Sequence, residues 1–132
     1  MPGKTFTLGV LVSDILNPFY GLVIQGVVDQ VEASGYEILI GPAGGTPRSQ
    51  ARMIDAMVDR QMDGLLLMSP IQPDADLEAV ARRTPTVVAG RHGPARYFDT
   101  VAGDDIAGSR LIVDHLVALG HHEISHLTSN AD

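Results

Sequence analysis

The chain contains no cysteine and no tryptophan among its 132 residues. Without cysteine it can form neither a disulfide nor a thiolate metal site, which is compatible with a reducing cytoplasm. It also lacks any apolar run near the ~20 residues that a membrane-spanning helix needs, and the apolar segment 8–12 is far shorter than the core of a secretory signal. We therefore expect a soluble, cytoplasmic chain with no membrane partner.

Positive charge is scarce, because 9 Lys and Arg residues face 16 Asp and Glu residues, for a net charge of −7. Binding to a polyanion needs a basic surface, so we do not expect this chain to bind DNA by itself. Its 45% hydrophobic and 19% charged residues are ordinary for a globular protein. A chain of this length has room for one domain with a real core.

Signatures of cofactor binding and catalysis are missing as well. Gly41, Gly44 and Gly45 follow a predicted strand but do not have the GxGxxG spacing of a dinucleotide site. The sequence has no P-loop, and no GxSxG motif that would present a nucleophilic serine. We expect no cofactor, no metal and no enzymatic activity.

Short apolar segments alternate with helical patterns along the whole chain. This alternation predicts an α/β three-layer sandwich, Rossmann-like, whose parallel sheet is covered by helices on both faces. The first strand is expected at the centre, because residues 8–12 are apolar at nearly every position. Strands are predicted at residues 5–12, 37–40, 64–68, 86–89, 100–102 and 124–127, and helices at 18–34, 47–62, 74–83 and 106–119.

The first helix has a clear start, and it carries more apolar surface than one buried face requires. Asn17 can cap it, and Pro18 suits its first turn because no amide hydrogen is needed there; Thr46 and Pro47 repeat this device in the second helix. The residues expected to face the sheet are Ile24, Val27, Val28 and Val31. Leu22 would then lie on the opposite side and Val23 on the flank, which predicts that this helix supports a homodimer.

Ligands of such sheets bind beyond the carboxyl ends of the strands. The candidate site therefore consists of the segments that follow the strands: 13–20, 41–46, 69–72, 90–91, 103–105 and 128–130. The first of these combines Ser13, Asp14 and Asn17 with Phe19 and Tyr20. Hydroxyl and carboxylate groups can bind the OH groups of a sugar while aromatic rings cover its C–H face. Alternatively, Asn17 only caps, Phe19 packs inward and Asp14 is solvated.

Polar side chains after the later strands are open to two interpretations each. Ser69 supplies a hydroxyl for a ligand or only for its loop. Arg91 can make paired hydrogen bonds to vicinal hydroxyls or a carboxylate, or it can form a surface ion pair with Asp99 or Asp104. Asp105 faces a ligand, or the pair Asp104-Asp105 caps the next helix; a divalent metal at this pair is the less favoured alternative, since no third ligand is evident.

Three segments together resemble the lactose/galactose-repressor (LacI/GalR) family of transcriptional regulators. They are residues 17–20 (NPFY), 101–108 (VAGDDIAG) and 115–124 (HLVALGHHEI), and the last is the most specific. Two positions depart from the family pattern, which usually has Asp where Gly90 stands and commonly Asn where Asp105 stands. The Gly-His turn at His121 occurs in the family without a metal, so His121, His122 and His126 are read as structural.

The resemblance implies that residues 4–130 form the N-terminal lobe of a small-molecule sensor, similar to a periplasmic binding protein. A DNA-binding domain and a second lobe would lie outside this chain. Such regulators bind an effector, here expected to be a sugar or related polyol, in the cleft between two lobes, and they bind DNA as homodimers through the separate domain. The residues expected at the ligand are Ser13, Asp14, Asn17, Phe19, Tyr20, Ser69, Arg91 and Asp105.

Two other functions fit the same residues. A periplasmic sugar-binding component of a transporter would share the fold and the cleft. A small metal-dependent α/β enzyme would use Asp104 and Asp105. With one lobe alone, we expect the chain to bind its effector weakly or not at all, because half of the burial and half of the polar contacts are missing.

Overall fold

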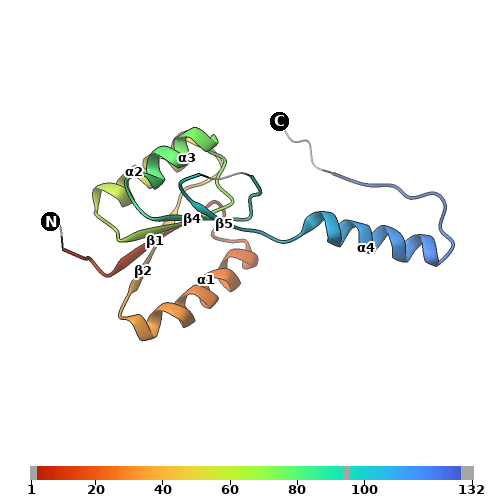
Figure 1. Cartoon of the computed structure of the whole chain (residues 1–132), viewed down its shortest axis with the longest axis horizontal. Coiled ribbons are helices and arrows are strands. Elements are labelled where there is room, and N and C mark those ends of the chain that lie inside the picture. The colour runs from red at the N-terminus through yellow and green to blue at the C-terminus, as the bar shows by residue number, and fades with distance from the viewer. Residues whose placement is uncertain (1–2, 94–95, 129–132) are drawn as a thin grey trace. The chain divides into compact units, whose positions relative to one another are not determined.

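The computed structural model describes residues 3–93 and 96–128. The chain splits into two compact units, Met1–Ala102 and Gly103–Asp132, which we describe one at a time. The first unit contains five strands and most of the helices (Figure 1). Its elements are β1 (Thr7–Val12), α1 (Pro18–Val31), the 3₁₀ turn η1 (Glu32–Ser34), β2 (Glu37–Pro42), α2 (Pro47–Asp59), β3 (Gly64–Met68), α3 (Asp74–Ala81), β4 (Thr86–Ala89) and β5 (Asp99–Val101).

All five strands form one parallel sheet in the order β2-β1-β3-β4-β5. The predicted α/β class and the parallel sheet are confirmed. β1 is hydrogen-bonded on both sides, to β2 and to β3, so it is interior as its apolar sequence suggests. The prediction that it is the central strand is wrong, because β3 holds the middle place. β3 is equally apolar, so apolar content alone does not separate these two interior strands.

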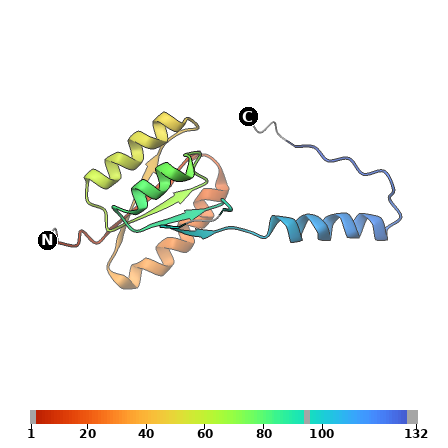
Figure 2. The same cartoon turned by 45° about the horizontal axis from the view of Figure 1, so that its top comes forward.

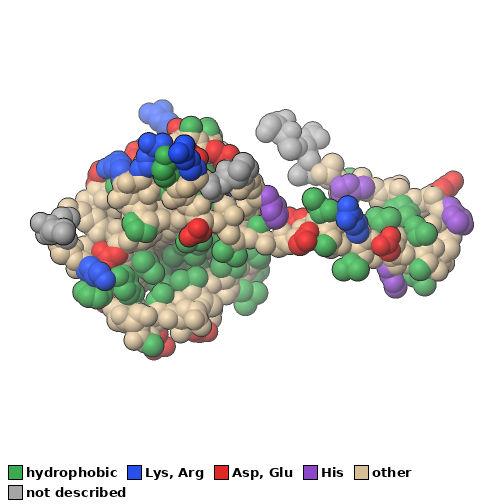
Figure 3. Space-filling view, in the orientation of Figure 1, with side chains coloured by type: hydrophobic (Ala, Val, Ile, Leu, Met, Phe, Trp, Pro, Cys, Tyr) green, Lys and Arg blue, Asp and Glu red, His purple; other side chains and the backbone are tan. Residues whose placement is uncertain are grey.

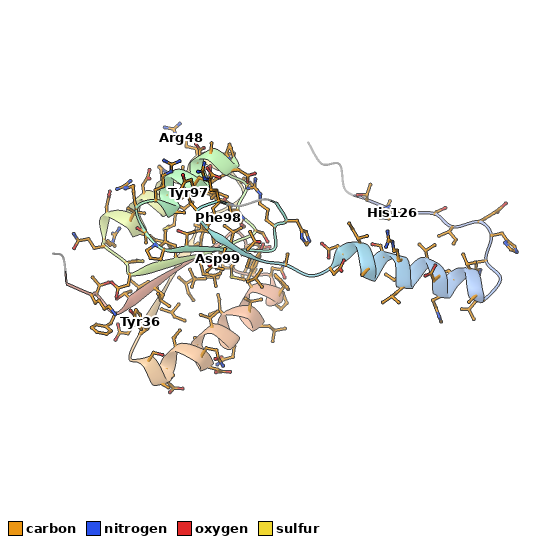
Figure 4. All side chains as sticks on the ribbon, in the orientation of Figure 1. Tyr36, Arg48, Tyr97, Phe98, Asp99 and His126 are labelled. Atoms are coloured by element: carbon orange, nitrogen blue, oxygen red, sulfur yellow. The ribbon has the colours of Figure 1, made fainter. Side chains whose placement is uncertain are left out.

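Helices cover both faces of the sheet (Figures 1 and 2). Crossover connections between parallel strands are right-handed. The connection through α1 runs from β1 to β2, and those through α2 and α3 run in the opposite direction across the sheet. α1 therefore packs on one face of the sheet, and α2 and α3 pack on the other. On the α2–α3 face, Leu11, Leu67 and Val88 pack with Ile54 and Leu77. Phe98, which lies on this side of the sheet in Figure 4, joins the same cluster. On the α1 face, the buried residues are Val10, Val12, Tyr20 and Met68.

Both predicted helix caps are present. The Asn17 side chain accepts a hydrogen bond from the Phe19 amide at 3.0 Å, and Thr46 Oγ1 accepts one from the Ser49 amide at 3.1 Å. The predicted sheet-facing stripe of α1 needs correction. Val23 and Ile24 pack against the α1-face core, whereas Val28 is 36% exposed. The sheet-facing stripe begins at buried Tyr20, one turn before Ile24, the first residue of the predicted stripe.

In the described residues of the second unit, 103–128, the helix is α4 (Asp105–Ala118) (Figure 1). Asp104 caps it by accepting a hydrogen bond from the Ala107 amide at 2.9 Å, as expected. The predicted sixth strand at 124–127 is wrong, since residues 121–128 have no strand assignment. A strand requires a hydrogen-bonded neighbour, which an apolar sequence by itself does not supply. Across residues 3–93 and 96–128, no helix is long and apolar enough to cross a membrane.

Candidate functional site at the carboxyl edge of the sheet

The strand order reverses between β1 and β3, which places the topological switch point at their carboxyl ends. The chain leaves β1 at Ser13 and β3 at Ser69, while Gly90 and Arg91 follow β4 in the same sheet. Parallel strands end at the same edge, so these loops lie together. The structure thus brings the predicted polar residues of the first unit to one edge.

Gln50, which the sequence analysis did not select, lies at the centre of this edge. Its side chain is fully buried, with 0% of its surface exposed. Its amide nitrogen donates to Ser13 Oγ at 3.1 Å and lies 3.5 Å from the Gly44 carbonyl oxygen, and its amide oxygen accepts from the Ile71 amide at 3.0 Å. One side chain therefore ties the loops that follow β1, β2 and β3.

A sequence signal for Gln50 existed. It stands one turn before Ile54, which begins the buried stripe of α2 that continues through Met57 and Val58. A polar residue at a stripe position is buried with the apolar ones, and a buried amide must find hydrogen-bond partners. A polar residue within the apolar stripe of a helix is thus as good an indicator of a candidate site residue as a polar residue in a loop.

Arg91 is held by the β3–α3 connection. Its guanidinium forms an ion pair with Asp74, with 2.6 Å between Nη2 and Oδ1, and donates to the carbonyl oxygens of Pro70 and Gln72. The predicted alternative, a surface ion pair, therefore describes part of its role, but the partner is Asp74 rather than Asp99 or Asp104. The arginine side chain remains 30% exposed, so it can still reach a ligand from this anchored position.

Gln72 extends the same network. It is buried, and its side-chain nitrogen donates to the Pro47 carbonyl oxygen at 2.6 Å. Because Arg91 binds the Gln72 carbonyl, the start of α2, the β3–α3 loop and the β4 loop are linked. A site assembled from separate loops gains fixed geometry from such links.

Ser69 and Gly90 touch at the ends of β3 and β4. Both have a left-handed backbone, with φ of 48° at Ser69 and 78° at Gly90. A Cβ added at Gly90 would lie only 2.7 Å from Ser69 Oγ. The Ser69 hydroxyl thus occupies the space beside position 90. This contact explains why the Asp that is usual in the resembled family could not stand here without moving Ser69.

The loop after β1 holds the remaining candidates of the first unit. Asp14 is exposed, and its carboxylate accepts from the Leu16 amide at 3.0 Å. Phe19 is 55% exposed and meets the Tyr20 ring edge-on, with 5.4 Å between centroids. Tyr20 itself is only 9% exposed and packs in the α1-face core. Of the two aromatic rings, Phe19 is therefore the one available to a ligand.

Asp105 belongs to the second unit, where it is the first residue of α4. Asp104, and not Asp105, provides the capping side chain, which leaves the ligand role of Asp105 a prediction.

The segment 128–130 was also predicted at the site; Ser129 and Asn130 lie outside the described residues. In the described part of the chain, no three His, Asp or Glu side chains are grouped so that they could hold a metal ion.

Arginine side chains lie over α2 and α3 together with acidic ones (Figure 3). Arg48 and Arg52 belong to α2, and Arg82 and Arg83 follow α3, whereas α1 has no basic residue. Arg82 also lies over the Tyr97 ring, with 4.1 Å from Cζ to the centroid, on the side of the sheet shown in Figure 4. Because α2 also carries Asp55 and Asp59, and α3 carries three acidic residues, this surface has charges of both signs, whereas the only charged residue of α1 is Asp29.

Comparison with known proteins places this geometry in a class. The family model for periplasmic binding proteins and the sugar-binding domain of LacI regulators matches residues 5–132. The chain is similar to the HTH-type transcriptional repressor CytR of Escherichia coli K12, with 31% identity over 119 residues, which cover 89% of this chain and 35% of CytR. It is also similar to the HTH-type transcriptional regulator GalR of Salmonella typhimurium LT2, with 30% identity over 127 residues, which cover 96% of this chain and 37% of GalR.

Among solved structures, the Cra transcriptional dual regulator of Pseudomonas putida in complex with fructose 1-phosphate matches with a TM-score of 0.76. It is 26% identical, and the match covers 87% of this chain and 43% of that one. The fold is that of a periplasmic-binding-protein-like LacI core domain. The chain belongs to the family of periplasmic binding proteins and LacI sugar-binding domains, as the sequence resemblance predicted. It spans little more than a third of the curated relatives that it matches.

Proposed function

We propose that this chain is the effector-sensing lobe of a LacI-family transcriptional regulator and that its carboxyl edge forms one wall of a sugar-binding cleft. One observation carries the proposal: at the switch point, the hydroxyls of Ser13 and Ser69 and the guanidinium of Arg91 stand in loops that partly buried hydrogen bonds hold in place. Fixed hydroxyl and guanidinium groups beside an exposed ring suit a small polyol.

The proposed roles follow the exposure of each group. Ser13 and Ser69 bind hydroxyl oxygens, Arg91 binds vicinal oxygens, and Phe19 covers an apolar C–H face. Asp14 accepts from a sugar OH group, and for Asp105, which belongs to the second unit, a ligand role stays a prediction from the sequence. Asn17 is engaged as the cap of α1, and buried Tyr20 supports Phe19, so these two shape the loop more than they bind.

We place the regulator in the cytoplasm, where it would bind DNA through a separate domain and enclose the effector with a second lobe. The chain itself would have no catalytic role, in keeping with relatives that are named as transcriptional regulators. An acidic chain with net charge −7 suits a sensing role better than direct DNA contact.

Isothermal calorimetry of the longer parent protein with pentoses, hexoses, nucleosides and fructose 1-phosphate tests this function. The proposal predicts micromolar binding of at least one compound and a loss of about ten-fold or more in the S13A variant, the scale of one hydrogen bond to a ligand. Binding that S13A leaves unchanged would place the ligand elsewhere.

A periplasmic sugar-binding component is the second candidate, because the matching family model includes periplasmic binding proteins. The two functions differ in what precedes residue 5 in the parent gene. A helix-turn-helix domain there supports the regulator, whereas a secretory signal peptide supports the transporter component.

We also propose that α1 supports a homodimer. Leu22 on α1 is 76% exposed, and Leu16, which lies just before the helix, is 88% exposed. Exposed apolar surface of this kind favours association. Sedimentation at high micromolar concentration should detect a dimer of this chain that a Leu22→Asp substitution weakens. A monomeric wild type, or a variant that associates equally well, would contradict the proposal.

A further inference from the structure

The hydrogen bonds of Gln50 have a direction that can be read from its partners. The backbone amide of Ile71 can only donate, so the group that it meets at 3.0 Å is the side-chain oxygen of Gln50. The carbonyl of Gly44 can only accept, so the side-chain nitrogen of Gln50 faces it at 3.5 Å. Two one-way partners therefore fix the orientation of the Gln50 amide.

With that orientation, the Gln50 nitrogen donates to Ser13 Oγ at 3.1 Å. The Ser13 oxygen thus accepts a hydrogen bond from the protein, and its own proton is left to point elsewhere. Gln50 is 0% exposed, so water does not compete for this bond from the Gln50 side. Ser13 itself is half-buried and so keeps access to solvent.

We propose that Gln50 is a positioning residue that turns Ser13 into a hydrogen-bond donor toward the ligand. The ligand atom at Ser13 is then an acceptor, such as a hydroxyl or ring oxygen of a sugar or an oxygen of a carboxylate or phosphate. This inference rests on the proposed function, because it takes Ser13 to contact the effector. The hydrogen bond that Gln50 donates to the side chain at position 13 can be tested without any effector.

The chain has no cysteine, so a Ser13→Cys substitution introduces one unambiguous thiol. A donor at Gln50 stabilises the thiolate, and the thiol pKa should therefore fall below its ordinary value of about 8.5. The pH dependence of alkylation by iodoacetamide measures this pKa, and the rate plateau at high pH measures access separately.

Adding Gln50→Met to S13C removes the donor with little change in volume. The alkylation rate at pH 7 should then fall about three-fold or more through a raised thiol pKa, with a similar plateau. Gln72→Met in the S13C background is the matched control, because buried Gln72 donates to the Pro47 carbonyl and not to position 13. Equal thiol pKa values in S13C with and without Q50M would overturn the proposal.

A second measurement covers the case in which S13C/Q50M does not fold. In the S13A variant, the side-chain NH₂ signals of Gln50 should shift in ¹⁵N-resolved NMR spectra, while those of Gln72 stay in place. Unshifted Gln50 signals would also overturn the proposal.

Calorimetry of the parent protein with the sugar panel adds the ligand. S13A and Q50M should weaken the same sugar, and the double variant should bind no more weakly than the weaker single variant, because both act through one contact. Additive losses would show that Gln50 does not act through Ser13. If the wild type binds no sugar, the proposed function fails, and the thiol measurement still decides the polarity of position 13.

Discussion

One polar side chain binds the connecting segments at each end of the sheet, and the two side chains differ in charge and in burial. At the carboxyl end, neutral Gln50 is fully buried and binds three loops. At the amino end, the partly exposed carboxylate of Asp63 binds the segment that enters β1. It accepts from the Thr5 and Phe6 amides at 2.9 and 3.0 Å, and the Thr5 hydroxyl lies 3.0 Å from it.

This difference separates the two ends in their response to pH. Hydrogen bonds from Thr5 lower the pKa of Asp63 below its ordinary value of 3.8, helped by the Phe6 amide and by Tyr36, which Figure 4 labels near the start of β1. Gln50 cannot ionise, so its contacts do not change with protonation. Gln50 and its three loop contacts, the hub of the carboxyl edge, are thus independent of pH, whereas the Asp63 contacts at the opposite end are sensitive to acid.

The largest effect is expected from Gln50→Leu. The substitution removes every hydrogen bond of the hub and leaves the Ile71 amide without its partner, so the free energy of unfolding should fall by about 2–3 kcal/mol. Urea unfolding measures the change. The control is Gln25→Leu on α1, where an exposed glutamine binds Asp29 and the change should stay within about 0.5 kcal/mol. Equal effects at both positions would show that Gln50 is not a hub.

Gly90→Ala should have the next largest effect. The backbone at Gly90 is left-handed, with φ of 78°, and the new Cβ would meet Ser69 Oγ at 2.7 Å. We expect a loss of about 1–2 kcal/mol in unfolding free energy, together with displacement of Ser69. Gly35→Ala is the matched control, since the backbone there is also left-handed, with φ of 72°, and no atom lies within 4 Å of a Cβ built at that position. A Gly90→Ala variant as stable as the wild type would show that the Ser69 contact does not restrict the side chain at position 90.

The smallest effect concerns Asp63 and depends on pH. A carboxylate with a lowered folded-state pKa stabilises the fold fully above its unfolded value, and this contribution is lost as pH falls through the folded pKa. The difference in Tm between wild type and Asp63→Asn should therefore be greatest near neutral pH and shrink below the ordinary value of 3.8. Thermal melts from pH 7 to pH 2 measure it, and a constant difference would contradict the assignment.

Local sequence signals predicted most of the fold. The caps at Asn17 and Thr46 and the apolar strands from 64–68 and 86–89 are determined by neighbouring residues, and the structure reproduces them. The central position of β3 was not predictable in this way, because β1 is just as apolar. The segment 124–127 has the composition of a strand, but a strand also needs a partner outside its own sequence.

The candidate site was predictable in its location and less so in its connections. Topology placed Ser13, Ser69 and Arg91 at the carboxyl edge because parallel strands end together. The pairing of Arg91 with Asp74 and the hub at Gln50 join residues that are 17 to 37 positions apart. Such partners depend on how helices pack across the sheet, which periodicity does not specify.

The most direct test of the carboxyl-edge site is an NMR titration of this chain with the sugar panel at concentrations up to tens of millimolar. Losing half the contacts of a micromolar ligand, whose binding free energy is about 8 kcal/mol, moves the dissociation constant toward millimolar. We predict binding that is millimolar or weaker, with any shifts confined to the loops that carry Ser13, Phe19, Ser69 and Arg91. Submicromolar binding, or shifts centred on Asp63 at the other end of the sheet, would contradict a half-cleft at the carboxyl edge.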